Sequence, residues 1–126
     1  MRLLLDTHAF LWWLNDDPKL HDAAREAISA PRTTVWISAA TIWEISIKRA
    51  IGKLLIDRGD LVEEISANEF IELPISARHA LVAGGLPKHH KDPFDRMLIA
   101  QAQVEALTLV TGDSAFGAYG VQTLPL

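Results

Sequence analysis

Four acidic residues occupy positions in this sequence where a solvated charge is not expected: Asp6, Glu44, Asp95 and Asp113. They come from four separate segments. If the fold brings two of these carboxylates within 4 Å, their repulsion costs ~4 kcal/mol at a surface-like dielectric. Such a cluster persists when a cation binds it or when its pKa values rise. Because the ligands would all be oxygens, with no cysteine in the chain, we expect Mg²⁺ or Mn²⁺.

Each acid also has a simpler interpretation when it is considered alone. Asp6 directly follows the apolar run Leu3–Leu5, and Asp113 follows a second apolar run, so both can be turn or cap residues. Glu44 falls among core-facing residue types on its predicted helix. It can instead form an exposed i, i+4 pair with Lys48, which contributes only ~0.3–0.5 kcal/mol.

Two acids lie three residues apart around Pro93, and the sequence assigns them different roles. Asp92 precedes the proline, which is the natural position for a helix N-cap, so we expect it to be structural. Asp95 continues the apolar stripe of the helix that follows, at its N-terminal end. We therefore assign Asp95, and not Asp92, to the site.

The segments that must position these acids alternate between strand and helix. Thr7 is expected to cap the first helix, Ser38 the third and Ser76 the fifth. Alternating strands and helices predict an α/β fold with a mainly parallel sheet covered on both faces, in which ligands bind beyond the carboxyl ends of the strands. We expect one domain over residues 1–126. The predicted strands are Leu3–Leu5, Thr34–Ser38, Phe70–Leu73, Thr108–Thr111 and Val121–Leu124; the predicted helices are Ala9–Leu14, Leu20–Ala30, Ala39–Leu54, Leu61–Ala67, Ser76–Ala83 and Pro93–Leu107, with one further helical turn near Ala115.

Composition limits the function classes. With 126 residues, 49% of them hydrophobic, the chain can bury a core of its own. No apolar run is long enough to cross a bilayer, and Asp6 interrupts any signal-peptide core. We therefore expect a cytoplasmic protein that does not associate with a membrane. The net charge of −4 gives no global attraction for nucleic acid.

Local basic residues are nevertheless placed beside the acids. Lys48 and Arg49 follow Glu44, and Lys91 and Arg96 flank Asp95. They are candidate contacts for an RNA backbone, and the alternative is a solvated helix face and a charged loop.

Apolar residues surround more than one face of the first predicted helix, over Phe10–Leu14. Part of this set is expected in the core. A remaining exposed patch would suit a dimer or another protein contact.

Four stretches of the chain, taken in order, resemble the PIN-domain family, specifically the VapC-like toxins of bacterial toxin–antitoxin pairs. They are LLLDTHAFLWWL, ISAATIWEISIK, HHKDPFDRMLIAQA and LTLVTGDSAF. The resemblance implies a three-layer α/β/α sandwich and Mg²⁺- or Mn²⁺-dependent RNA cleavage. It matches Asp6, Glu44 and Asp95 to the three core acids and Asp113 to a less constant fourth. It also implies a homodimer and a cognate antitoxin protein.

The residues and the resemblance together predict a metal-dependent endoribonuclease. Asp6 and Asp95 are expected to be metal ligands, Glu44 a ligand or water-orienting base, and Asp113 a second-metal or water-mediated ligand. Thr7 and Thr111 are candidates for hydrogen bonds to these ligands. One alternative is a catalytically inactive PIN-fold binding protein. Another is a receiver-type phospho-acceptor module, which Asp6 without an acidic neighbour does not favour.

Overall fold

A five-stranded parallel sheet forms the centre of the protein, which we describe from a computed structural model over residues 1–56, 59–89 and 92–126. The strand order is β3-β2-β1-β4-β5, and all four pairings are parallel. The strands are β1 (Arg2–Leu5), β2 (Thr34–Ser38), β3 (Ile71–Leu73), β4 (Thr108–Val110) and β5 (Thr123–Leu124). This order differs from the 2-1-3-4-5 order of receiver-type modules, so the receiver alternative is wrong.

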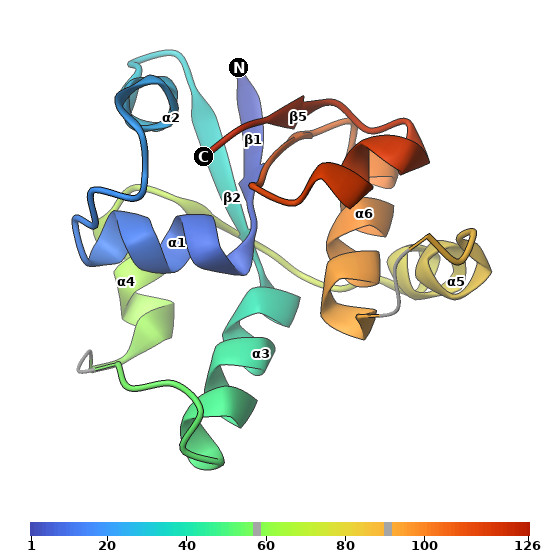
Figure 1. The fold of residues 1–126 in the computed structure, drawn as a ribbon, viewed down its shortest axis with the longest axis horizontal. Helices are drawn as coiled ribbons and strands as arrows, with labels where there is room; N and C mark the ends of the chain where they lie inside the picture. Colours follow the sequence, from blue (N-terminus) through green and yellow to red (C-terminus); the bar gives the residue numbers. More distant parts are fainter. Residues whose placement is uncertain (57–58, 90–91) are drawn as a thin grey trace.

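Helices cover both faces of the sheet (Figure 1). They are α1 (Thr7–Leu14), α2 (Asp22–Ser29), α3 (Ala39–Ala50), α4 (Leu61–Ala67), α5 (Ala77–Gly85), α6 (Pro93–Glu105) and the 3-10 helix η1 (Ser114–Tyr119). Successive strand residues point to opposite faces. Leu3 and Leu5 accordingly pack in a core with α1, α2 and α4, whereas Leu4 packs in a second core with α5 and α6. The predicted three-layer α/β/α sandwich is confirmed.

The order of strands reverses at the first strand. β1 is central, and the chain moves to β2 and β3 on one side of it and to β4 and β5 on the other. In an open parallel sheet such a switch point leaves a crevice at the carboxyl ends of the strands. Asp6 follows β1, and Thr111 and Asp113 follow β4, so the sheet brings these residues to the crevice.

The start of α1 differs from the prediction. Asp6, and not Thr7, is the N-cap, because the Asp6 carboxylate accepts a hydrogen bond from the Ala9 backbone N–H. Thr7 is the first helical residue, and its hydroxyl is directed to another element, as described below. A carboxylate at an N-cap satisfies a backbone donor that the helix itself cannot satisfy.

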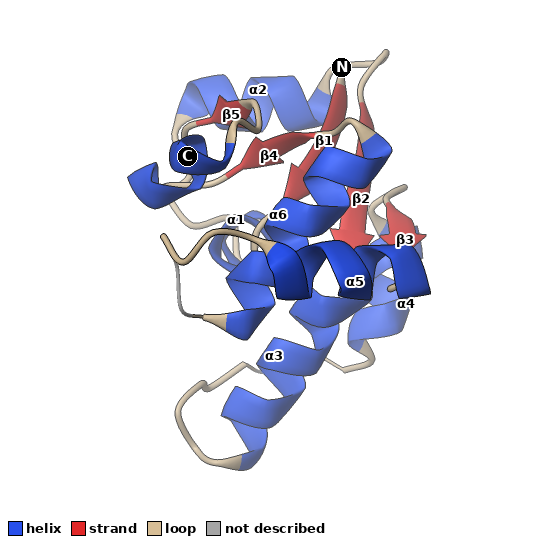
Figure 2. Cartoon of the chain, turned by 90° about the vertical axis from the view of Figure 1, so that its right-hand side faces the viewer, coloured by secondary structure: helices blue, strands red, loops and turns tan. Residues whose placement is uncertain are grey.

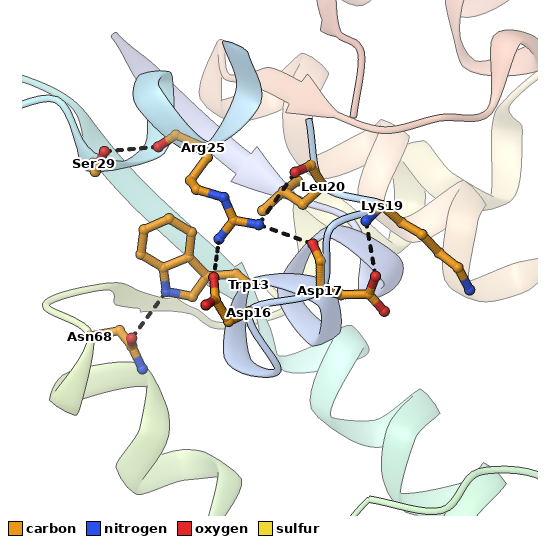
Figure 3. A network of polar contacts seen from close by, with 8 residues as sticks. All are labelled: Trp13, Asp16, Asp17, Lys19, Leu20, Arg25, Ser29 and Asn68. Atoms are coloured by element: carbon orange, nitrogen blue, oxygen red, sulfur yellow. Dashed lines mark hydrogen bonds and ion pairs between the residues drawn. The ribbon is translucent and has the colours of Figure 1, made fainter. Parts of the chain in front are cut away.

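The connection from α1 to α2 is held by Arg25. Its guanidinium donates to the Asp16 carboxylate at 2.8 Å and to the Asp17 carbonyl oxygen at 3.0 Å (Figure 3). Trp13 at the end of α1 donates to the Asn68 side chain at 3.0 Å, which ties α1 to the residue after α4. Helix α1 ends at Leu14, where the sequence predicted its end.

Helix α3 extends beyond the carboxyl end of β2 and away from the sheet (Figure 2). It ends at Ala50, four residues before the predicted end at Leu54. Gly52 has a φ of 74°, and the backbone N–H of Lys53 donates to the carbonyl oxygen of Lys48 at 2.8 Å. This closing pattern, with glycine in the left-handed region, ends the helix.

Most of the apolar residues of α1 lie in the core, as part of the set was expected to. Phe10, Leu11 and Leu14 are buried in the core, and Trp12 and Trp13 are partly buried against it. Trp12 and Trp13 are therefore the apolar side chains of α1 that keep some exposure, and a protein contact on this helix stays a prediction.

Within the described part of the chain, no helix combines the length and apolar character needed to cross a membrane.

Candidate functional site

A pocket of about 570 Å³ lies at the carboxyl ends of β1 and β4. All four acids predicted for the site line it, and Asp92 is a fifth. The two lysines in its wall are Lys48 and Lys53. The remaining walls are formed by Thr7, His8, Leu11, Trp12, Leu54, Gly112, Phe116 and Leu126. The fold therefore gathers carboxylates from four segments into one concave surface.

Asp6 is the most deeply placed aspartate of the pocket, with 7% of its surface exposed. One oxygen, Oδ1, accepts from the Ala9 N–H at 2.8 Å, and the Thr111 side chain forms a further hydrogen bond with the carboxylate. Burial raises the pKa of Asp6, because the charged form is desolvated. The two hydrogen bonds lower this pKa, and the nearby Glu44 carboxylate raises it further, but burial has the largest effect.

Glu44 is also buried and both of its oxygens are engaged. The Thr7 hydroxyl donates to Oε1 at 2.5 Å, and the Lys48 ammonium donates to Oε2 at 2.6 Å. The bond to Glu44 is the main reason that the pKa of Lys48 is raised. Glu44 is thus a buried carboxylate in a site wall and, at the same time, one member of the i, i+4 pair that we gave as its alternative.

Asp92 and Asp95 lie at the start of α6. Asp92 is the N-cap, and its Oδ1 accepts from the N–H groups of Phe94 at 2.8 Å and Asp95 at 3.2 Å. The structural role predicted for Asp92 is confirmed, although its side chain also lines the pocket. Asp95 is half-buried in the first turn, where the positive end of the helix dipole favours a carboxylate.

Asp113 caps the 3-10 helix η1. Its Oδ1 accepts from the Ala115 N–H at 2.9 Å, and its own backbone N–H donates to the Thr111 hydroxyl oxygen at 3.1 Å. Thr111 is buried and therefore connects Asp6, at the end of β1, with Asp113, after β4. Both threonines proposed as partners of the acids form such contacts.

The donor set fits a divalent cation that prefers oxygen ligands. The close convergence expected from the sequence is not present, however: across residues 1–56, 59–89 and 92–126, no three His, Asp or Glu side chains approach one another closely enough to hold a metal ion. Backbone N–H groups, hydroxyls and Lys48 hold the carboxylate oxygens instead. A metal bound by three or more of these acids requires their side chains to move closer together.

The basic residues that were predicted to contact RNA have different hydrogen-bond partners in the structure. Lys48 pairs with Glu44, and Arg49 is exposed and donates to the Ile56 carbonyl oxygen. Arg96 donates to three carbonyl oxygens at the end of α5 and after it, which is a structural role. Lys91 lies outside the described residues. Contact of any of these four with RNA stays a prediction.

Two pocket residues, His8 and Trp12, were not predicted from the sequence to lie at the site. His8 stacks on Trp12, with ring centroids 5.7 Å apart, and both line the pocket. Their spacing of four residues places them on one face of α1. That spacing was visible in the sequence, but the apolar residues around them gave no sign of which face would meet the acids.

Comparison with known proteins identifies one family. Residues 3–121 match the family model described as the PIN domain. Comparison with curated protein sequences found no match.

Several solved structures have a similar fold at low sequence identity. VapBC2 from Rickettsia felis bound to a promoter DNA fragment contains a chain with 18% identity and a TM-score of 0.69, and the alignment covers 100% of this chain and 99% of that one. A chain of DNA-bound VapBC from Salmonella typhimurium has 19% identity and a TM-score of 0.66, and the alignment covers 99% of this chain and 98% of that one. A chain of VapBC-1 from nontypeable Haemophilus influenzae has 20% identity and a TM-score of 0.63, and the alignment covers 99% of this chain and 98% of that one. At these identities the comparison shows the fold alone.

Proposed function

This chain belongs to the PIN-domain family, and from that membership and the pocket we propose that it is a metal-dependent endoribonuclease, the toxin of a toxin–antitoxin pair. One observation carries the proposal: the acids Asp6, Glu44, Asp95 and Asp113 line a single pocket at the switch point of a parallel sheet. Asp6 and Glu44 are buried there, and a buried carboxylate costs stability unless it is paired, hydrogen-bonded or bound to a cation.

Asp6 and Asp95 are proposed to hold the metal, with Glu44 as a ligand or water-orienting group and Asp113 as an outer ligand. A divalent cation bound here would lower the pKa of a coordinated water and offset the charge of the phosphate. Thr111 forms hydrogen bonds with the Asp6 carboxylate and with the backbone N–H of Asp113, and so links the two residues. Thr7 holds Oε1 of Glu44 and so fixes the plane of that carboxylate.

The substrate is proposed to be RNA. Lys53 lines the pocket and is exposed, and Arg49 is exposed on α3, the helix that carries Glu44. Cations at such positions can contact phosphates without neutralising the metal ligands. His8 and Trp12 add a stacked aromatic pair to the wall, a surface on which unpaired bases can stack.

The proposed protein partners are a cognate antitoxin and a second copy of the chain. Three solved structures with this fold are of VapBC complexes, which supports an antitoxin partner. Exposed large apolar side chains such as Trp43, Leu55 and Leu81 are candidates for such contacts.

A catalytically inactive PIN-fold binding protein is the second candidate. The engaged oxygens of Glu44, and the wide spacing of the acids among the described residues, favour it. It predicts binding of RNA or of a partner protein without cleavage.

One experiment separates the two candidates. The protein is induced in cells, and newly formed RNA 5′ ends are sequenced, with Asp6→Asn as the control. The nuclease produces new ends at recurring sites that are absent with Asp6→Asn. The same 5′ ends with both proteins, or with neither, would contradict the nuclease proposal.

A further inference from the structure

The Glu44–Lys48 pair forms part of the pocket wall, and its two members differ in exposure. The Glu44 side chain is 6% exposed and that of Lys48 is 45% exposed, with 2.6 Å between Nζ and Oε2. A carboxylate removed from water needs a nearby positive charge. In the structure Lys48 supplies that charge to Glu44.

Lys48 also experiences other acids of the pocket. The charges of Asp92 and Asp95 act on its ammonium in addition to that of Glu44. The ammonium therefore lies in the negative field of the pocket, where a bound divalent cation would also lie. A lysine ammonium is a compact point charge on a flexible stem, and a half-exposed one can move into solvent without a burial cost.

The Lys48 ammonium and a divalent metal ion cannot both contact the same oxygen of Glu44 at low energetic cost. Its Oε1 is held by the Thr7 hydroxyl and its Oε2 by Lys48, and a divalent ion and an ammonium in contact with one oxygen would repel each other strongly. A divalent cation at Oε2 would therefore compete with Lys48 for that oxygen, whereas the Thr7 hydroxyl at Oε1 is neutral and can stay. Displacing Lys48 relieves the repulsion, whereas displacing Thr7 does not.

We propose that Lys48 is a built-in counter-cation of the pocket, which neutralises Glu44 in the metal-free protein and leaves it when a divalent cation binds. This inference rests on the proposed function, because it assumes that the pocket takes such a cation. It assigns Lys48 to the control of metal loading, which differs from the RNA contact predicted from the sequence. The exchange forms and breaks no covalent bond.

The test is a calorimetric titration of Mn²⁺ into metal-stripped protein, using wild type, Lys48→Met and Lys53→Met. Methionine keeps the apolar stem and removes the charge. Lys53 lines the same pocket and is the control for a general loss of positive charge. We expect Lys48→Met to bind Mn²⁺ about fivefold more tightly or better, a difference of ~1 kcal/mol. Lys53→Met should differ from wild type by less than about twofold, because exposed charges are screened by salt.

Thermal melting of the metal-free proteins provides a second readout. Lys48→Met should melt at a lower temperature than wild type because Glu44 loses its counter-charge, whereas Lys53→Met should melt like wild type. Addition of saturating Mn²⁺ should remove most of the deficit of Lys48→Met.

The outcomes separate this inference from the proposed function. Wild type that binds Mn²⁺, together with Lys48→Met that binds it equally or more weakly, overturns the exchange and leaves the proposed function intact. Equal tightening by both lysine variants also overturns the exchange, because it reports only the net charge. Wild type that binds no Mn²⁺ overturns the proposed function and the inference with it.

Discussion

Asp6 combines two physical demands within one carboxylate. It caps α1 and is almost fully buried, so the backbone requires an acceptor at this position, while burial penalises the negative charge. An asparagine would satisfy the backbone equally well. The pKa of Asp6 is raised because burial outweighs the stabilising hydrogen bonds.

Asp6→Asn should therefore make the metal-free protein more stable at neutral pH. The pKa of Asp6 is raised in the folded state, so folded wild type binds a proton at this residue more tightly than unfolded wild type does. The destabilising effect of the charged carboxylate therefore disappears as the pH falls through the raised pKa. The stability difference between variant and wild type should shrink in that range. The measurement is a series of melting curves at decreasing pH without metal. A difference that widens on acidification would contradict this assignment.

Residue types predicted four acids that line the pocket but not all of their contacts. Asp6, Glu44 and Asp95 each interrupt an apolar pattern, and that anomaly pointed to one pocket. Thr7 was expected to cap α1. It instead contacts Glu44 on α3, which is 37 positions away in the sequence. No local pattern specifies such a contact.

At the scale of elements, the length of α3 places the basic residues of the pocket. Glu44 and Lys48 lie on the helix, and Lys53 follows its end. Gly52 is the residue that stops the helix, because its φ of 74° is one that only glycine adopts at little cost. The helix pattern of apolar residues continues past Ala50, so periodicity predicted too long a helix.

Two glycine substitutions test this account of α3. Gly52→Ala should destabilise the protein by ~1 kcal/mol, because alanine is strained in the left-handed region. Gly84→Ala, within α5, should stabilise it by ~0.5–1 kcal/mol, since a helical backbone suits alanine better and an added Cβ would meet no atom within 4 Å. Chemical denaturation gives both values. Equal effects of the two substitutions would show that Gly52 does not end the helix for this reason.

For the whole molecule, the strand order determines where the pocket lies. β1 pairs with β2 on one side and with β4 on the other, so that Leu3 is opposite both Val35 and Thr108. Alternation of strands and helices predicted a parallel sheet. It did not predict the order of strands, because pairings between residues more than 100 positions apart leave no local trace.

A bound metal should stabilise the whole protein. Mn²⁺ or Mg²⁺ that binds only the folded state raises the free energy of unfolding by ~2.7 kcal/mol at a concentration of 100 Kd. The melting temperature should therefore rise with the concentration of either ion. Sodium chloride of equal ionic strength is the control for screening, and a shift no larger than the control would count against a metal site.

The central claim is that the carboxylate pocket is a nuclease centre, and it is tested most directly by RNA cleavage rates of Asp95→Asn and Asp92→Asn with Mn²⁺. These neighbouring acids both line the pocket, but Asp92 caps α6 whereas Asp95 is the proposed ligand. Asp92→Asn keeps the cap and should cleave at nearly the wild-type rate, while Asp95→Asn should fold normally and lose at least about 100-fold in rate. Cleavage by Asp95→Asn at the wild-type rate, or its loss in Asp92→Asn alone, would contradict the account.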